Sequence, residues 1–437
     1  MSFDPSVFTK ASELKKKIFF TLMALFICRL GSYITVPGIN IASLNEFSDS
    51  NASGVLGMFN MLSGGSLSRM SVFALAIMPY ITASIVMQLL TVTIKPLEEM
   101  KKDGASGRKR INQLTKYLTV ILVITQAYGV AVSLEKLSTS VGPIVSSPGV
   151  FFRISTVTAL TVGTMFLMWL GEQISEKGIG NGTSLIIFTG IVAGLPQAFA
   201  AVFELVRSGA MAPITLIVIL ASIAFTVFFI VFMERAHRRI SIQYPKRQKG
   251  NKMFGGESTH LPLKLNTAGV IPPIFANSIL LFPLTIANFM NQSGGEDSIW
   301  QEITLYLGRG KLLYLVLYVA FIIFFAFFYT SIVFNSKETA DNLKKNGAFV
   351  HGYRPGTDTA NYFDLILTRL TTIGSIYIAF ICVLPEYLSS KFHIPFYLGG
   401  TSFLIVVNVV LDTFTQIQSS LFSYQYESLV KKARLRR

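Results

Sequence analysis

The stretch SVFALAIMPYITASIVMQLLTVTI, residues 71–94, carries the two properties that decide the fold of this chain. It is uncharged and apolar, and a run of about 20 such residues is long enough to cross a bilayer as a helix. Pro79 interrupts it, and a proline inside a membrane span is tolerated where a neighbouring helix or a cavity satisfies the freed backbone. The stretch predicts a membrane helix beside a pathway, although a simple packing kink explains the proline as well.

The composition extends this prediction to the whole chain. Of its 437 residues, 51% are hydrophobic and only 14% are charged, whereas soluble domains carry roughly a quarter charged residues. The basic cluster at residues 15–17 precedes an apolar run too long for a cleaved signal, so we expect a retained first span. We therefore predict an all-α polytopic membrane protein with ten spans, approximately 18–36, 71–94, 117–134, 151–170, 183–206, 213–233, 265–290, 312–334, 370–386 and 399–421.

The positions of the basic residues test the number of spans. If the N-terminus is cytoplasmic, 30 of the 38 Lys and Arg residues fall in cytoplasmic segments and seven in outer segments, with Arg29 inside the first span. Lys and Arg concentrate on the cytoplasmic side of membrane proteins. The distribution predicts that both termini are cytoplasmic. The asymmetry would be lost if one span near the middle had been overlooked or wrongly added.

Ten spans divide into two halves of five, residues 1–208 and 209–437. Because five is odd, equivalent halves have opposite orientations, as in the inverted repeats of many transport proteins. A weak echo supports this division, since the second span of each half contains the pattern P-x-I-x-A. The matching residues are Pro79, Ile81 and Ala83 in the first half and Pro272, Ile274 and Ala276 in the second.

The inventory of reactive side chains excludes several function classes. The spans are nearly free of charge, with Arg29 and Asp412 as the clear interior exceptions, whereas secondary transporters usually carry ionisable residues at mid-membrane. No nucleotide-binding motif, metal-ligand spacing or nucleophile–base pair is present, so we expect no enzyme activity, metal or cofactor. An apolar lining suits a constriction that blocks ions by dewetting. A small-solute transporter and a membrane scaffold remain the alternatives.

Two long loops, residues 234–264 and 335–368, fall on the predicted cytoplasmic side. Both are rich in Lys and Arg. Such residues suit phosphate groups or acidic protein surfaces, although a topology signal alone also requires some of them. Because loops of this length usually carry function, we expect docking sites for a partner that supplies energy.

The stretch MFNMLSGGSLSRM, residues 58–70, precedes the second span. It is too apolar for a solvated loop, and Gly64-Gly65 and Arg69 make it a poor membrane span. Irregular backbone at membrane depth is permitted where it lines a cavity. The stretch predicts a short half-helix with a glycine hinge, resting against a pathway.

Several long motifs resemble one family. They are FNMLSGGSLSR (59–69), MFLMWLGEQISEKGIGNGTSLIIF (165–188), STHLPLKLNTAGVIP (258–272), FNSKETADNLKKNGAFVHGYRPG (334–356) and GGTSFLIVV (399–407). In this order, they resemble the SecY family, the central subunit of the bacterial protein-conducting channel, and the similarity extends from about residue 14 to 434. The resemblance implies two inverted halves around an hourglass pore, through which secreted polypeptides pass and from which membrane segments exit sideways.

The resemblance also implies roles for particular residues of this sequence. The pore ring comprises Ile77, Ile81, Ile187, Ile274 and Ile405. The movable plug covers about 55–70 and includes Met58, Phe59, Asn60, Gly64, Gly65 and Arg69. The polar cluster of the lateral gate, between spans two–three and seven–eight, comprises Thr82, Gln126 and Asn277. The docking residues for the ribosome and SecA are Arg238, Arg239, Lys246, Arg247, Lys252 and Arg354.

The partners implied by the resemblance are the SecE and SecG subunits, the SecA motor and the ribosome. Signal sequences and nascent polypeptides are its passengers, and membrane lipid receives segments that leave sideways. The implied location is the bacterial inner membrane.

Overall fold

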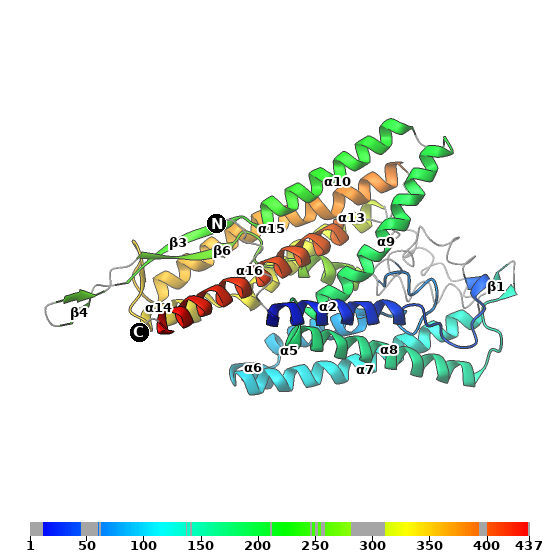
Figure 1. The fold of residues 1–437 in the computed structure, drawn as a ribbon, viewed down its shortest axis with the longest axis horizontal. Helices are drawn as coiled ribbons and strands as arrows, with labels where there is room; N and C mark the ends of the chain where they lie inside the picture. Colours follow the sequence, from blue (N-terminus) through cyan, green and yellow to red (C-terminus); the bar gives the residue numbers. More distant parts are fainter. Residues whose placement is uncertain are drawn as a thin grey trace.

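The computed structural model describes residues 12–44, 60, 63–136, 138–139, 142–209, 212–244, 247–249, 252–254, 258–280, 311–392 and 400–435. Figure 1 shows an elongated bundle of helices with a small sheet at one end, near the end of the last helix. All-α membrane architecture is therefore confirmed, with β-structure confined to short pieces.

In the described part of the chain, a helix overlaps each predicted span. These helices are α2 (Ser12–Gly31), α5 (Met78–Thr93), α7 (Ala105–Lys136), α8 (Val150–Lys177), α9 (Gly182–Arg207), α10 (Pro213–Glu234), the unlabelled helix Ile271–Leu280, α13 (Leu312–Val333), α15 (Thr357–Phe392) and α16 (Gly400–Leu435). By length and apolarity alone, seven described helices qualify as membrane spans, or eight with one bent pair. The remaining helices are α6 (Lys95–Lys102) and α14 (Ser336–Lys345).

Prolines set the bounds of α5, which is shorter than the predicted span 71–94. Pro79 lies in the first turn of the helix, where the missing amide hydrogen costs no internal hydrogen bond. Residues 63–77 instead form successive turns, and Ala76 has a φ of 48°. At its other end, α5 meets α6 at a 98° bend that coincides with Pro96 in the first turn of α6.

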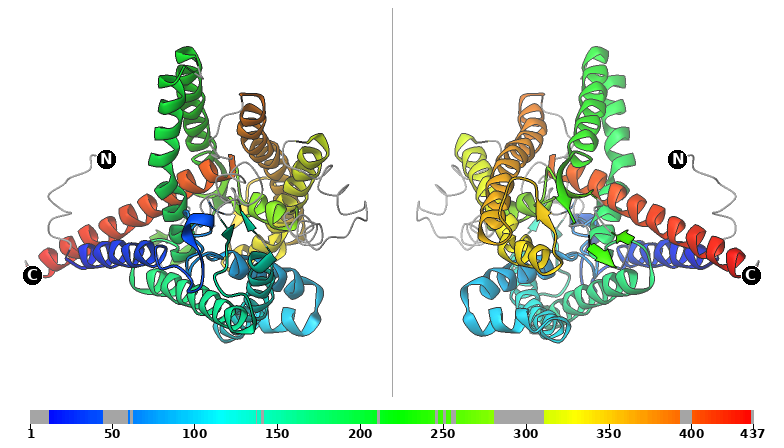
Figure 2. Two further views of the ribbon diagram at one scale, coloured as in Figure 1. Left: turned by 90° about the vertical axis from the view of Figure 1, so that its right-hand side faces the viewer. Right: turned by 90° about the vertical axis from the view of Figure 1, so that its left-hand side faces the viewer.

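The two halves of the chain have separate cores. Viewed along the long axis, α7 and α8 lie on one side of the molecule and α13 and α15 on the other (Figure 2). One buried cluster, which includes Ala127 and Leu160, draws only on the first half. Another, which includes Ile230 and Ile378, draws only on the second half. The boundary between the halves at residue 208 stays a prediction.

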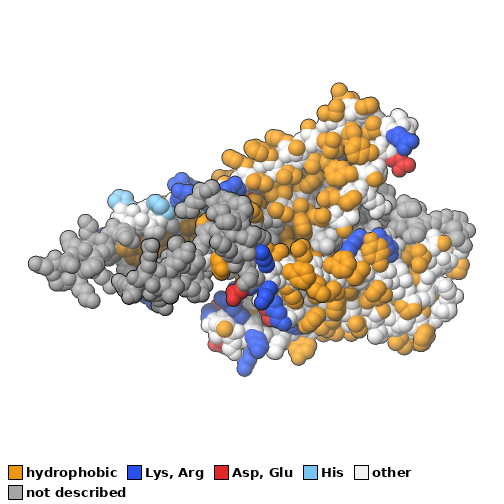
Figure 3. Space-filling view, viewed as in Figure 1, with side chains coloured by type: hydrophobic (Ala, Val, Ile, Leu, Met, Phe, Trp, Pro, Cys, Tyr) orange, Lys and Arg blue, Asp and Glu red, His pale blue; other side chains and the backbone are white. Residues whose placement is uncertain are grey.

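Large apolar side chains cover much of the outer surface. They include Phe151, Ile214 and Phe228, each more than two thirds exposed, and Figure 3 shows an apolar band over the helices. A soluble protein rarely exposes so continuous an apolar surface, so these faces fit lipid contact.

Short strands form three small sheets. In the largest, β3 (His237–Gln243) lies between β6 (Ser258–Lys264) and β7 (Phe349–Val350), both antiparallel to it. The sheet joins the two predicted docking loops, a contact that the sequence did not predict. Its buried members Ile240, Leu263 and Val350 pack against α15. The other strand pairs are β1 (Ser138–Thr139) with β2 (Gly142–Pro143), and β4 (Arg247–Lys249) with β5 (Lys252–Phe254).

Candidate functional site

The five isoleucines predicted to form a ring meet in one apolar cluster. Ile77 is the N-cap residue of α5. The other four lie one each in α5, α9, helix Ile271–Leu280 and α16. Three are buried and two pack against the buried ones; the members are Ile77, Ile187 and Ile405, with Ile81 and Ile274. Residues up to 328 positions apart in the chain, Ile77 and Ile405, thus converge in one cluster.

A small cavity adjoins this cluster. Its volume is about 30 Å³, and Ile77 and Ile187 lie in its wall together with Ser63, Ser66 and Arg29. A space of this size holds on the order of one water molecule. The segment that precedes α5 therefore lies directly over the isoleucine cluster and leaves little open volume there.

Among the described plug residues, Asn60 is helical and residues 63–69 form turns, so the predicted half-helix stays a prediction. Asn60 organises the segment, because its backbone oxygen accepts a hydrogen bond from Gly65 N at 2.7 Å and its side-chain oxygen accepts one from Ser68 N at 2.8 Å. Gly64 and Gly65 have φ values of 67° and 81°, which glycine adopts without strain and which break a helix. Met58 and Phe59, the other predicted plug residues, lie outside the described residues.

An apolar seam joins the two halves at the predicted lateral gate. Ile85 of α5 is buried against Phe275 of helix Ile271–Leu280 and Phe325 of α13, and Ile81 and Leu89 pack around them. The rings of Phe275 and Phe325 meet edge to face with centroids 5.5 Å apart. The seam is therefore closed by side-chain packing.

The three predicted polar gate residues share no hydrogen bond in the described structure. Thr82 Oγ1 donates to Met78 O within its own helix at 3.2 Å, and Gln126 is exposed. Asn277 is buried, and its Oδ1 accepts from the Tyr314 hydroxyl of α13 at 3.4 Å. A polar contact across the seam stays a prediction.

The docking residues lie at the end of the molecule that carries the sheet. Arg238 and Arg239 are exposed on β3, and Arg354 is exposed four residues after β7. Because β7 pairs with β3, arginines from the two loops lie at the same end of the molecule. Three more predicted residues have no described side-chain position: Arg247 lies on β4, Lys252 lies on β5, and Lys246 lies outside the described residues.

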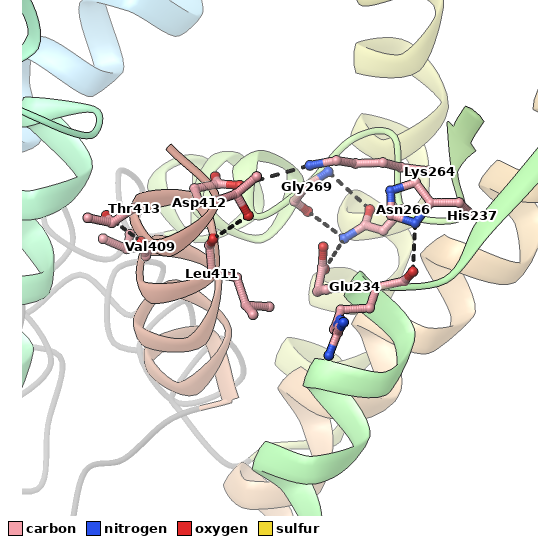
Figure 4. Close-up of polar contacts among 11 residues, drawn as sticks. Glu234, His237, Lys264, Asn266, Gly269, Val409, Leu411, Asp412 and Thr413 are labelled. Carbon is pink, nitrogen blue, oxygen red and sulfur yellow. Dashed lines mark hydrogen bonds and ion pairs between the residues drawn. The ribbon is translucent and has the colours of Figure 1, made fainter. Parts of the chain in front are cut away.

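A buried polar group at the start of helix Ile271–Leu280 was missed by the sequence analysis. Glu234 is 8% exposed at the end of α10, and its Oε1 accepts from Asn266 Nδ2 at 2.6 Å. The Asn266 Oδ1 accepts from Gly269 N at 3.0 Å, and Lys264 lies 3.9 Å from Asp412 of α16. Figure 4 shows these side chains converging from three elements. The sequence did contain one indication, because Asn side chains commonly bond nearby backbone amides at turns and helix starts.

These features define a class of protein: a polytopic helical membrane protein in which isoleucines from distant parts of the chain meet in one buried apolar cluster. A family model described as SecY matches residues 71–414. Protein translocase subunit SecY of Rickettsia bellii is 59% identical over 426 residues, which cover 98% of each chain.

Two solved structures share the fold. One, described as a protein-conducting channel, is 18% identical with a TM-score of 0.69 over 94% of this chain and 93% of that chain. Sec61 in the canine ribosome–channel complex from the endoplasmic reticulum is 17% identical with a TM-score of 0.66 and the same coverage. The chain belongs to the SecY family. It is a multi-pass membrane protein and a protein-conducting translocon channel subunit, and this family is not enzymatic.

Proposed function

We propose that the five isoleucines, Ile77, Ile81, Ile187, Ile274 and Ile405, form the constriction through which a polypeptide passes. The observation that carries this proposal is their convergence in one apolar cluster that contains residues of both halves. An apolar collar makes no demand on the chemistry of the passenger, and when closed it excludes water and ions by dewetting. The energy for transport comes from a partner.

The segment 55–70 is the plug of this constriction. Support comes from the position of Ser63 and Ser66 in the wall of the cavity next to Ile77 and Ile187. Displacement of the segment opens this cavity from one side. The five isoleucines can then separate to admit a polypeptide.

The seam between α5 on one side and helix Ile271–Leu280 and α13 on the other is the lateral gate. Its packing is entirely apolar at Ile85, Phe275 and Phe325. Signal sequences and membrane segments are themselves apolar, so they can replace these contacts when they leave for the lipid.

The sheet end of the molecule docks the partners that supply energy. Arg238, Arg239 and Arg354 suit ribosomal RNA phosphates and the acidic groups of a motor such as SecA. A ribosome–channel complex among the structural neighbours supports the first partner. The proposal places the chain in the bacterial inner membrane with both termini cytoplasmic, together with SecE and SecG.

The test of this function is resting ion conductance. Channel complexes with Ile81→Gly and Ile274→Gly, reconstituted in planar bilayers, are expected to leak ions without a passenger, because glycine removes the apolar collar. The control is Ile230→Gly in α10, whose side chain packs within the second half. Unchanged conductance in the ring variant would refute the assignment of the constriction.

A further inference from the structure

The described residues of segment 60–69, which are 60 and 63–69, are attached to the rest of the protein at two separate places. The first lies at its C-terminal end, where the chain that follows α2 pairs with residues 70–72. Val36 N donates to Met70 O at 3.0 Å, and Val72 N donates to Ile34 O at 2.9 Å. Met70 has a φ of 42° and is 1% exposed, so this end is fixed in a strained, buried turn.

The second attachment is a single side chain, Arg29 of α2. Its Nη1 donates to Gly64 O at 2.5 Å, and its Nη2 reaches the Tyr33 hydroxyl at 3.5 Å. The guanidinium of Arg69, from the segment itself, lies over the same Tyr33 ring at 4.3 Å from its centroid. These contacts tie Gly64 and Arg69 to the last turn of α2 and to Tyr33, just after that helix ends.

Gly64 lies where only a glycine fits. A Cβ added there would lie 2.8 Å from Gly190 Cα and 3.2 Å from Gly190 O in α9, and the φ of 67° adds strain. The backbones of the segment and of α9 are therefore in direct contact. Beneath them lies the small cavity whose wall includes Cys28 and the ring residues Ile77 and Ile187.

Arg29 has no carboxylate partner among the described residues. In these partly buried surroundings, its charge is stabilised by the Gly64 carbonyl and by the face of Tyr33, 5.2 Å away, and removing a cation from such partners is costly. Outward movement of the segment separates Arg29 from the carbonyl. The closed position is thus favoured by the arginine itself.

We propose that Arg29 is the positioning residue that holds segment 60–69 closed over the isoleucine ring, through its hydrogen bond to Gly64 O. The fixed pairing at residues 70–72 is the pivot, and Arg29 determines how readily the segment leaves its position. This inference rests on the proposed role of the segment as a plug, and adds the contact that regulates it.

The native thiol of Cys28 reports on the position of the segment, because it lies in the wall of the covered cavity. The experiment uses the complete channel complex in lipid nanodiscs, with Cys382→Ser and cysteine-free partner subunits, and a small charged thiosulfonate reagent. Arg29→Met is expected to raise the labelling rate about tenfold, as for the loss of a hydrogen bond to a charged group. Arg29→Lys keeps one donor and should give a smaller increase.

Gly64→Ala is the second variant, since the added Cβ would overlap Gly190 Cα and lie 3.1 Å from Arg29 Nη1, which displaces the segment while the arginine charge beside Cys28 is retained. It too should increase the labelling rate. The matched controls are Arg207→Met, an exposed arginine at the end of α9, and Gly209→Ala, a glycine with a φ of 76° and no neighbour within 4 Å. Neither should change the rate.

Deletion of residues 60–67 separates this inference from the function on which it rests. In the deleted channel, Arg29→Met should cause no further increase in labelling, and an equal increase in both backgrounds would overturn the inference. Unchanged labelling in the Arg29→Met and Gly64→Ala variants of the full-length chain would also overturn it. If the deletion itself leaves ion conductance unchanged, the sealing role of the plug is refuted, while the labelling rates still decide the role of Arg29.

Discussion

Replacement of Ile85 by alanine should weaken the closed lateral gate. Ile85 is 5% exposed and is the buried side chain that α5 contributes to the seam against Phe275 and Phe325. Alanine keeps the helix but removes three carbon atoms from the contact between the halves. The open gate loses nothing by this change, since there the position faces lipid or a passenger.

The magnitude follows from the kind of contact that is lost. An Ile→Ala change in a protein core costs about 2–5 kcal/mol, which combines transfer from water with the cavity left behind. In a membrane, lipid replaces water in the open state, so mainly the packing part counts. We therefore expect a shift of about 2 kcal/mol toward the open gate, or roughly 30-fold in the ratio of open to closed channels.

Two measurements report this shift. A secreted reporter enzyme with a shortened signal sequence should be exported faster through the Ile85→Ala channel, because the gate no longer requires a strong signal to open. Cysteines at Leu89 and Ile271, on opposite sides of the seam, should be joined more slowly by a short thiol crosslinker. Ile230→Ala, which removes the same atoms from α10, is the control. A folded variant with unchanged export and crosslinking would refute the seam.

Three further changes test other parts of the protein. Ile81→Ala, in contact with both the ring cluster and the seam, should raise both resting ion conductance and export of the weak-signal reporter. Arg354→Glu should weaken SecA-driven export on the order of tenfold or more and affect ribosome-driven membrane insertion less; equal losses would contradict its role. Asn266→Ala should lower the free energy of unfolding by about 1–3 kcal/mol, measured by thermal denaturation in detergent. The double variant Asn266→Asp, Glu234→Gln should be more stable than Asn266→Ala.

The spans could be predicted because length and apolarity are local properties of the chain. The run 213–233 needs no tertiary context to be recognised, and α10 covers Pro213–Glu234. The start of α5 was misplaced because apolar composition does not distinguish a helix from buried turns. The left-handed backbone at Met70 and Ala76 comes from packing under the segment, and neither residue type suggests it.

Contacts between distant segments were beyond the sequence. Ile81 could be linked to Ile77 by helical spacing and to Ile274 by the internal echo, whereas Ile187 and Ile405 came from family resemblance alone. Nothing in the sequence of β7 indicates that Val350 pairs with Ile242 of β3, because a two-residue strand has no periodicity. The bond from Arg29 to Gly64 O also depends on a turn that the residue types leave open.

The helix α5 connects the proposed constriction to the proposed lateral gate through one row of isoleucines. Residues spaced by four lie on the same face of a helix, and here the contacts change gradually along that face. Ile77 belongs to the ring cluster alone, Ile85 belongs to the seam alone, and Ile81 contacts both. Because a helix moves as a rigid element, a displacement of α5 that loosens the seam also withdraws Ile77 and Ile81 from the ring. The proposed sites therefore predict that sideways opening and widening of the pore are two effects of one movement.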